Sequence, residues 1–302
     1  MLRQRTDLVQ VVGVVTQPDK PQGRSLKLAF SPVKQVAVAD SILVWQPARA
    51  RNPEFIAELG GLNLDLIVVA AYGQILPQAL LDVPRYGCLN LHGSILPAYR
   101  GAAPIQWAML DGRPETGVTL MRMDAGLDTG DMLAVRTTAI RDDDDLGSLH
   151  DRLALLSGEL LLDSLPAYLS GELNPTPQPA EGVSYARKIV KEDGLVNWEQ
   201  SNAAVWNRVR GSIPWPGAFT HVDGPGGRPF VLKLWRAHKV AGDGVAGTVL
   251  NGPKTELRVA CGSGAVAVTE VQREGGKRMA AQDFLRGFPM APGTKVGAPT
   301  VP

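Results

Sequence analysis

Asn90 and His92 are the first residues whose types and spacing could perform chemistry. They stand two apart at the end of the apolar segment 87–92, which is predicted to be a strand. Side chains two apart on a strand point to the same face, and open α/β sheets bind ligands at the carboxyl ends of their strands. An amide and an imidazole there could donate hydrogen bonds to one developing oxyanion. A strand-end pair that only satisfies backbone groups would show the same pattern.

A carboxylate that could act on His92 comes from the segment 124–131. This segment holds three acids separated by glycines, but it lacks the later glutamate that a calcium-binding EF-hand loop requires. We therefore predict that Asp128 reaches His92, orients its ring and stabilises the imidazolium that forms when the ring takes a proton. For Asp124 and Asp131 we predict roles in turns and caps.

The segment 93–97, Gly-Ser-Ile-Leu-Pro, follows the histidine directly. Its glycine and proline predict a constrained loop, which could offer backbone groups to a planar ligand or only connect a strand to a helix. The sequence contains no Walker or HExxH motif, so P-loop nucleotide-binding and zinc-peptidase functions have no motif to support them.

The elements that must position these residues alternate between apolar strands and helices. We predict strands at residues 8–15, 42–45, 64–70, 87–92 and 117–123, and helices at 32–40, 53–59, 77–83, 104–110 and from 146 to 165. This alternation predicts an α/β fold with a doubly wound, mostly parallel, Rossmann-like sheet over residues 1–172.

The proline-rich segment 173–183 ends this pattern and is predicted to be a semi-rigid linker. Beyond it, residues 184–302 show short strand-like segments separated by glycine clusters. These segments are residues 230–235, 247–250, 256–260 and 265–271, with helices only at 202–210 and 281–286. The pattern predicts a small OB-like β-barrel as a second domain.

Composition and charge narrow the class of protein. The 302 residues suffice for two hydrophobic cores, and no apolar run approaches the roughly 20 residues that cross a bilayer. The two cysteines, Cys88 and Cys261, have no disulfide or zinc-site spacing, so we expect a cytoplasmic enzyme. Residues 1–183 carry a net charge of −6 and residues 184–302 a net charge of +7. The basic half indicates either a polyanionic partner or only a solvated basic surface.

Two stretches together resemble the signature of the folate-dependent formyltransferases. They are residues 90–107, NLHGSILPAYRGAAPIQW, and residues 123–133, MDAGLDTGDML. The GAAPIQ stretch at 101–106, the loop at 16–24 and the second half, with its YARKI and PWP segments, resemble the branch that acts on charged initiator tRNA. The resemblance covers nearly the whole chain.

This resemblance implies a catalytic triad of Asn90, His92 and Asp128. The folate-contacting loop that it implies consists of Ser94, Ile95, Leu96 and Pro97, and the tRNA contacts are Arg24, Lys20 and Lys27. The implied reaction moves the formyl group of 10-formyltetrahydrofolate to the methionine amine of initiator methionyl-tRNA, without metal, ATP or membrane. The basic second domain would bind tRNA phosphates. We expect a monomer with no obligate protein partner.

Two other functions stay open at this point. One is folate-dependent formyl transfer to a small amine such as an amino-sugar nucleotide, and the other is a catalytically impaired tRNA-binding remnant. The basic second half and Arg24 favour tRNA as the acceptor over a small amine. Purine-precursor enzymes of the superfamily resemble only the first domain.

The resemblance also implies a strand, a turn and a helix before Leu8. Residues 1–7 leave no room for this unit, and the first strand of a doubly wound sheet is central. We therefore expect a gap in the middle of the sheet, which a start assigned too far downstream or a truncation would explain.

Overall fold

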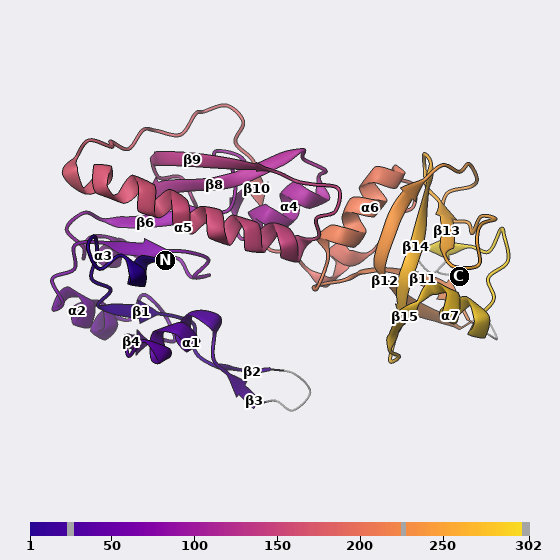
Figure 1. Cartoon of the computed structure of the whole chain (residues 1–302), viewed down its shortest axis with the longest axis horizontal. Coiled ribbons are helices and arrows are strands. Elements are labelled where there is room, and N and C mark those ends of the chain that lie inside the picture. The colour runs from indigo at the N-terminus through magenta and orange to yellow at the C-terminus, as the bar shows by residue number, and fades with distance from the viewer. Residues whose placement is uncertain (23–26, 225–227, 298–302) are drawn as a thin grey trace. The chain divides into compact units, whose positions relative to one another are not determined.

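The computed structural model describes residues 1–22, 27–224 and 228–297 (Figure 1). The chain divides into two compact units. The first holds residues 1–102, 117–138 and 153–185, and the second holds residues 103–116, 139–152 and 186–302. Two pieces of the first half of the chain thus belong to the second unit. The predicted domain limits, 1–172 and 184–302, stay a prediction.

The first unit contains a mixed sheet that carries the predicted site. Its four strands lie in the order β5 (Ile67–Val69), β6 (Cys88–His92), β8 (Glu115–Arg122) and β9 (Met132–Ala139). β6 runs parallel to β5 and antiparallel to β8. The strand predicted at 117–123 is therefore present, but its direction makes the sheet mixed. β9 did not appear among the predicted strands.

The strands predicted for a single sheet lie in two separate sheets within the described residues. β1 (Gly13–Val15) pairs in parallel with β4 (Leu43–Trp45) as a separate two-stranded sheet. Among the described residues, neither of these strands pairs with β5. All residues of β1 and β5 are only partly buried, whereas the central strands of a doubly wound sheet are covered on both faces.

Helices alternate with these strands along the chain, at positions that the local sequence favours. They are α1 (Pro32–Ala39), α2 (Pro53–Gly60), α3 (Gln78–Leu81), α4 (Pro104–Leu110) and α5 (Leu146–Ser170). Ser31 and Asn52 cap α1 and α2 with their side chains, and each helix has proline in its first turn. Leucines at 149, 153, 160, 161 and 165 form the buried stripe of α5.

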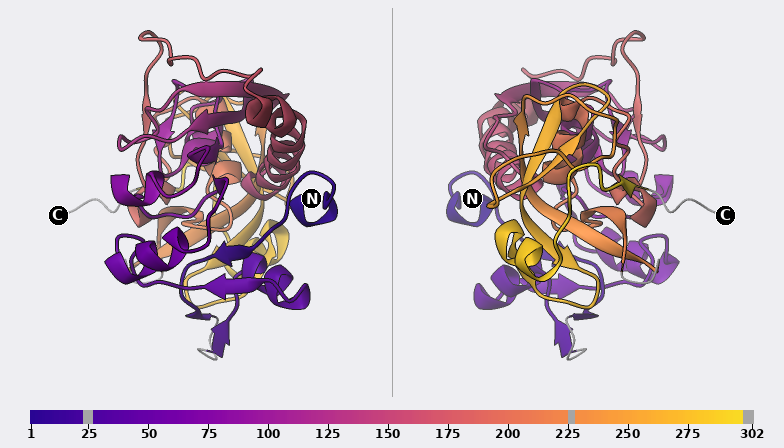
Figure 2. Two further views of the ribbon diagram at one scale, coloured as in Figure 1. Left: turned by 90° about the vertical axis from the view of Figure 1, so that its left-hand side faces the viewer. Right: turned by 90° about the vertical axis from the view of Figure 1, so that its right-hand side faces the viewer.

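The second unit is built on a curled antiparallel sheet (Figure 2). Its strands lie in the order β13 (Leu257–Ala260), β14 (Ala265–Arg273), β12 (Pro229–Val240), β11 (Ala218–Asp223) and β16 (Val296–Gly297), and β15 (Arg278–Ala280) pairs with β14. The helices α6 (Asn202–Gly211) and α7 (Ala281–Gly287) pack against it. The described strands form an open path from β13 to β16, so the OB-like barrel is not confirmed. The strand predicted at 247–250 makes only isolated bridges.

Short elements complete the described chain. They are the 3-10 helices η1 (Leu2–Gln4) and η2 (Lys191–Gly194), the strands β7 (Arg100–Gly101) and β10 (Tyr185–Ala186), and a hairpin of β2 (Lys20–Gln22) and β3 (Lys27–Ala29). The hairpin lies where the sequence predicted only a loop. Within the described residues, none of the helices has the length and apolar character needed to cross a membrane.

Candidate active site

β6 presents Asn90 and His92 at its carboxyl end. Both are almost fully buried, with 8% and 5% of their surface exposed. Main-chain pairing holds Asn90 between Val69 of β5 and Met121 of β8, and it places His92 opposite Thr119 of β8. The period of a strand then places the two side chains on one face, as the sequence predicts.

The imidazole of His92 is oriented by a backbone carbonyl. Its Nε2 lies 2.9 Å from the carbonyl oxygen of Tyr99. A carbonyl can only accept a hydrogen bond, so this contact assigns the proton of the neutral ring to Nε2. The other nitrogen, Nδ1, lies 3.7 Å from Oδ2 of Asp128. Nδ1 is therefore the atom that can gain and lose a proton, and the imidazolium so formed faces a carboxylate.

Asp128 is held in place by its backbone conformation and by a hydrogen bond that its carboxylate accepts. Its φ of 53° lies in the left-handed region, which few residues other than glycine, asparagine and aspartate adopt. Its Oδ2 accepts a hydrogen bond of 2.8 Å from the N–H of Gly101. Unusual backbone conformations of this kind concentrate at functional sites.

The segment Tyr99–Gly101 therefore holds both members of the pair. The Tyr99 carbonyl accepts from His92, and the Gly101 N–H donates to Asp128. Ser184 anchors this segment, since its hydroxyl accepts from the N–H of Tyr99 at 2.9 Å. Sequence reasoning missed these contacts, because no residue pattern shows which backbone groups of a loop meet a distant side chain.

The side-chain amide of Asn90 makes no hydrogen bond within the part of the chain that the structure describes. It stands on the same strand face as His92, so its N–H groups can donate to a ligand atom that gains negative charge. The Nε2 of His92 is already engaged by Tyr99. Of the predicted pair of oxyanion donors, the amide is the one that no described residue engages as a donor.

Cys88 lies two residues before Asn90 on β6, but it cannot supply a nucleophile. Its side chain is buried, and burial raises the pKa of the thiol to about 12. A thiol must lose its proton to attack a carbonyl carbon. Cys88 therefore stays protonated at neutral pH and contributes to the packing of the sheet.

The loop after β6 is fixed from inside by two hydroxyl groups. Ser94 is fully buried and donates to the carbonyl of Ala98 at 2.6 Å. Thr119 of β8 donates to the Ser94 carbonyl at 2.8 Å and accepts from the N–H of Leu96 at 3.0 Å. Thr119 was missed by sequence reasoning, because only the register of β8 against β6 brings it here.

The four residues predicted to contact folate differ in what they can offer. The side chains of Ser94 and Leu96 are buried, so a ligand contact from them would come through their backbone. Ile95 and Pro97 are half-buried and can offer side-chain surface. A loop of this rigidity loses little conformational freedom when it binds a ligand.

Sequence comparison places this site in a known family. Residues 1–165 match the formyl transferase family, and residues 188–289 match the formyl transferase C-terminal domain. The chain belongs to the formyl transferase family. Relatives named methionyl-tRNA formyltransferase include one from Citrifermentans bemidjiense, 49% identical over 95% of this chain and 89% of its own length. Another, from Myxococcus xanthus, is 47% identical over 96% of this chain and 91% of its own length.

Solved structures share the fold of this formyl transferase. One is HypX from Aquifex aeolicus in complex with tetrahydrofolic acid, with a TM-score of 0.59 and 24% sequence identity. The match covers 82% of this chain and 43% of HypX. At this identity the likeness establishes the fold alone.

Two of the three residues predicted to contact tRNA, Lys20 and Lys27, lie on the hairpin strands. Lys20 lies on β2 and is exposed. Lys27 lies on β3, where it pairs with Gln22. Arg24 lies outside the described residues. The three roles stay predictions.

Proposed function

We propose that this protein transfers the formyl group of 10-formyltetrahydrofolate to the methionine amine of initiator methionyl-tRNA. Its relatives at 47–49% identity carry the name methionyl-tRNA formyltransferase and align with nearly the whole chain. The observation that carries the proposal is the Asn90 amide, which no described residue engages, beside a His92 whose Nδ1 faces Asp128 at 3.7 Å. Acyl transfer to an amine needs an oxyanion donor and a proton acceptor, and this strand end supplies both.

Each residue of the site has a distinct task in this reaction. Asn90 donates to the formyl oxygen, which gains negative charge as the amine nitrogen bonds to the formyl carbon. His92 accepts at Nδ1 the proton that the amine loses, and Asp128 stabilises the imidazolium. The same Nδ1 returns the proton to the folate nitrogen as the bond between that nitrogen and the formyl carbon breaks. Every proton and electron pair is then accounted for.

The loop 94–97 suits a planar cosubstrate because its shape is set before binding. The Thr119 hydroxyl joins two backbone groups of this loop, and it lies in a fully buried position. Folate contacts from Ile95 and Pro97, and from the backbone at Ser94 and Leu96, then meet a fixed surface.

Replacing Thr119 with valine is expected to raise the KM for 10-formyltetrahydrofolate about tenfold. Valine keeps the shape but leaves the Ser94 carbonyl and the Leu96 N–H without their partner, at a cost of about 1–3 kcal/mol per buried group. Steady-state kinetics with each substrate varied in turn measure the effect. Thr116→Val removes another buried hydroxyl from the same strand and serves as the control. An unchanged folate KM in Thr119→Val would show that the hydroxyl does not shape the folate site.

The acceptor is assigned to tRNA by the charge of the chain and by the hairpin. Residues 184–302 carry a net charge of +7, which suits a polyanion. Lys20 and Lys27 on the hairpin strands, with Arg24 between them in the sequence, add three basic residues. In this proposal the hairpin segment contacts the acceptor end of the tRNA.

The test of the proposed function is an acceptor comparison. The full chain is incubated with 10-formyltetrahydrofolate and one acceptor at a time: methionyl initiator tRNA, methionyl elongator tRNA or an amino-sugar nucleotide. Formylated product is expected from the initiator tRNA with the highest kcat/KM. Product from the sugar alone would move the acceptor to a small amine, and no product from a folded chain would contradict enzymatic formyl transfer.

A further inference from the structure

Gln178 lies in the proline-rich segment 174–179, whose sequence indicates only a connector. In the structure its Nε2 donates to the carbonyls of Asp128 and Gly130, each at 2.8 Å. Its Oε1 accepts from Nη2 of Arg100 at 2.7 Å and from Nε of Arg100 at 3.1 Å. A side-chain amide has two donor hydrogens and two acceptor lone pairs. The Gln178 amide therefore uses its whole hydrogen-bonding capacity on Asp128, Gly130 and Arg100.

The contacts of Gln178 join the two segments that hold the catalytic pair. On one side it binds the turn 128–130, where Asp128 has its left-handed backbone. On the other side it binds Arg100, whose neighbours Tyr99 and Gly101 contact His92 and Asp128. The Gln178 amide thus connects the two segments that hold Nδ1 of His92 and Oδ2 of Asp128 in contact.

Attachment of the proline-rich segment does not depend on Gln178. Thr176 and Met132 exchange two backbone hydrogen bonds of 2.8 Å, which dock the segment beside β9. Pro177 and Pro179 flank Gln178 and fix the local φ angles. The amide is therefore presented to the turn 128–130 in advance, and its contacts serve that turn rather than the docking of the segment.

We propose that Gln178 is a positioning residue for the His92–Asp128 pair. By fixing the turn 128–130 against Arg100, it sets the separation between the carboxylate of Asp128 and the imidazole of His92. This inference rests on the proposed function, because it assigns a role in the same acyl transfer. It makes the segment between the two family matches a part of the active site and not only a tether.

The test compares Gln178→Ala and Gln178→Glu with wild type. Alanine removes all four hydrogen bonds, and an ionised glutamate keeps the contact with Arg100 but cannot donate to the two carbonyls. We expect both variants to lower kcat about 10- to 100-fold, since small misplacement of reacting groups costs about 10²-fold. The KM for tRNA is expected to stay near wild type, because the hydrogen bonds of the Gln178 amide are all made to Arg100, Asp128 and Gly130.

A second variant background provides a reading that a merely structural role would not change. If Gln178 acts through the His92–Asp128 pair, Gln178→Ala should lower kcat only slightly further in an Asp128→Asn background, because groups that act as a unit have strongly non-additive effects. Thr176→Ala removes a side-chain hydroxyl from the same segment and should leave kcat unchanged.

The NMR signal of His92 separates this inference from the proposed function. The chain has four histidines, so the spectrum of His92→Ala assigns the His92 signal. We expect the chemical shifts of the His92 ring to change in both Gln178 variants and to stay unchanged in Thr176→Ala, whether or not any tRNA is formylated. Unchanged kcat and unchanged His92 chemical shifts in folded Gln178 variants would overturn the inference. An inactive wild type with the expected changes in chemical shift would instead contradict the proposed function alone.

Discussion

Replacing His92 with alanine is expected to lower kcat for formyl transfer by about 10²- to 10⁴-fold, the usual worth of a positioned acid–base group. The variant loses the atom that takes the proton from the attacking amine. Asp128→Asn keeps the shape of the side chain and can still accept from Gly101. It removes the negative charge 3.7 Å from Nδ1, so kcat should also fall steeply. Single-turnover assays with charged tRNA measure the chemical step, and filter binding should show tRNA affinity close to wild type.

A double variant that combines His92→Ala with Asp128→Asn tests whether Asp128 acts through His92. Groups that act as a unit have strongly non-additive effects on catalysis. We therefore expect the double variant to be scarcely slower than His92→Ala alone. His150→Ala is the matched control, because its side chain is 63% exposed on α5, and it should keep wild-type turnover. Effects that multiply in the double variant would show that the two residues work independently.

The local part of this site could be predicted from the sequence. Alternation along a strand is enough to place Asn90 and His92 on one face, and an apolar segment is enough to identify β6. The starts of α1 and α2 could also be predicted, because Ser31 and Asn52 are capping residues that each precede a proline. These features depend only on residues close together in the chain.

The direction of a strand is not a local property. β8 has the burial pattern of a covered strand, and that pattern is the same for parallel and antiparallel neighbours. Its antiparallel pairing with β6 places Thr119 opposite His92 and so brings a hydroxyl to the loop 94–97. A sequence that predicts the strand but not its register therefore misses Thr119.

The supports of the catalytic pair escaped prediction for a related reason. The Tyr99 carbonyl and the Gly101 N–H are backbone groups, which every residue possesses. Gln178 is 50 positions from Asp128 in the chain, in a segment whose prolines indicate an extended connector. Only the folded chain shows that the proline-rich segment lies beside the turn 128–130.

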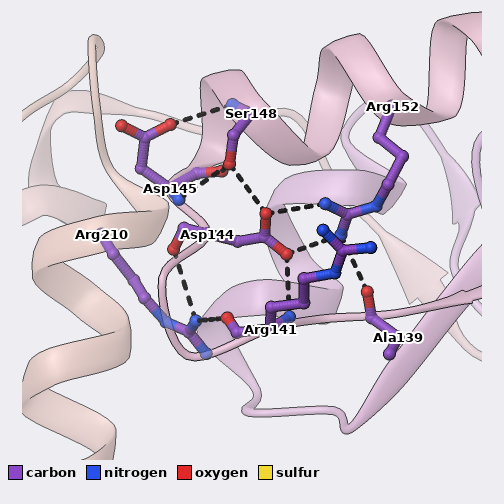
Figure 3. A network of polar contacts seen from close by, with 7 residues as sticks. All are labelled: Ala139, Arg141, Asp144, Asp145, Ser148, Arg152 and Arg210. Atoms are coloured by element: carbon purple, nitrogen blue, oxygen red, sulfur yellow. Dashed lines mark hydrogen bonds and ion pairs between the residues drawn. The ribbon is translucent and has the colours of Figure 1, made fainter.

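Replacing Asp144 with alanine is expected to lower the free energy of unfolding by about 3–5 kcal/mol, the cost of removing one partner of a buried ion pair. Asp144 stands in a run of four aspartates, which usually indicates a solvated charged surface. Only 4% of it is exposed, and its carboxylate accepts from the guanidinium of Arg152, from the hydroxyl of Ser148 and from the backbone of Arg141 (Figure 3). Urea unfolding followed by circular dichroism measures the loss.

The backbone of the same loop is tied to α6. Nη1 of Arg210 donates to the carbonyls of Arg141 and Asp144, at 2.6 Å and 3.3 Å (Figure 3). Arg210 is itself buried, so loosening this loop takes both carbonyl acceptors from Nη1 of a desolvated guanidinium. The loss in Asp144→Ala should therefore appear as cooperative destabilisation of the unit that contains α6.

The pH dependence of stability gives an independent measure of the same ion pair. The hydrogen bond from Arg152 lowers the pKa of Asp144 from 3.8 to about 2, which corresponds to roughly 2–3 kcal/mol of stability. Because the folded pKa is depressed, this contribution is complete above about pH 4 and is lost as the pH falls toward 2. Asp144→Asn should show a shallower loss of stability across that interval than wild type. Asp142→Asn, whose carboxylate is 86% exposed, should follow the wild-type curve; equal slopes for wild type and Asp144→Asn would show that Asp144 titrates normally in the folded chain.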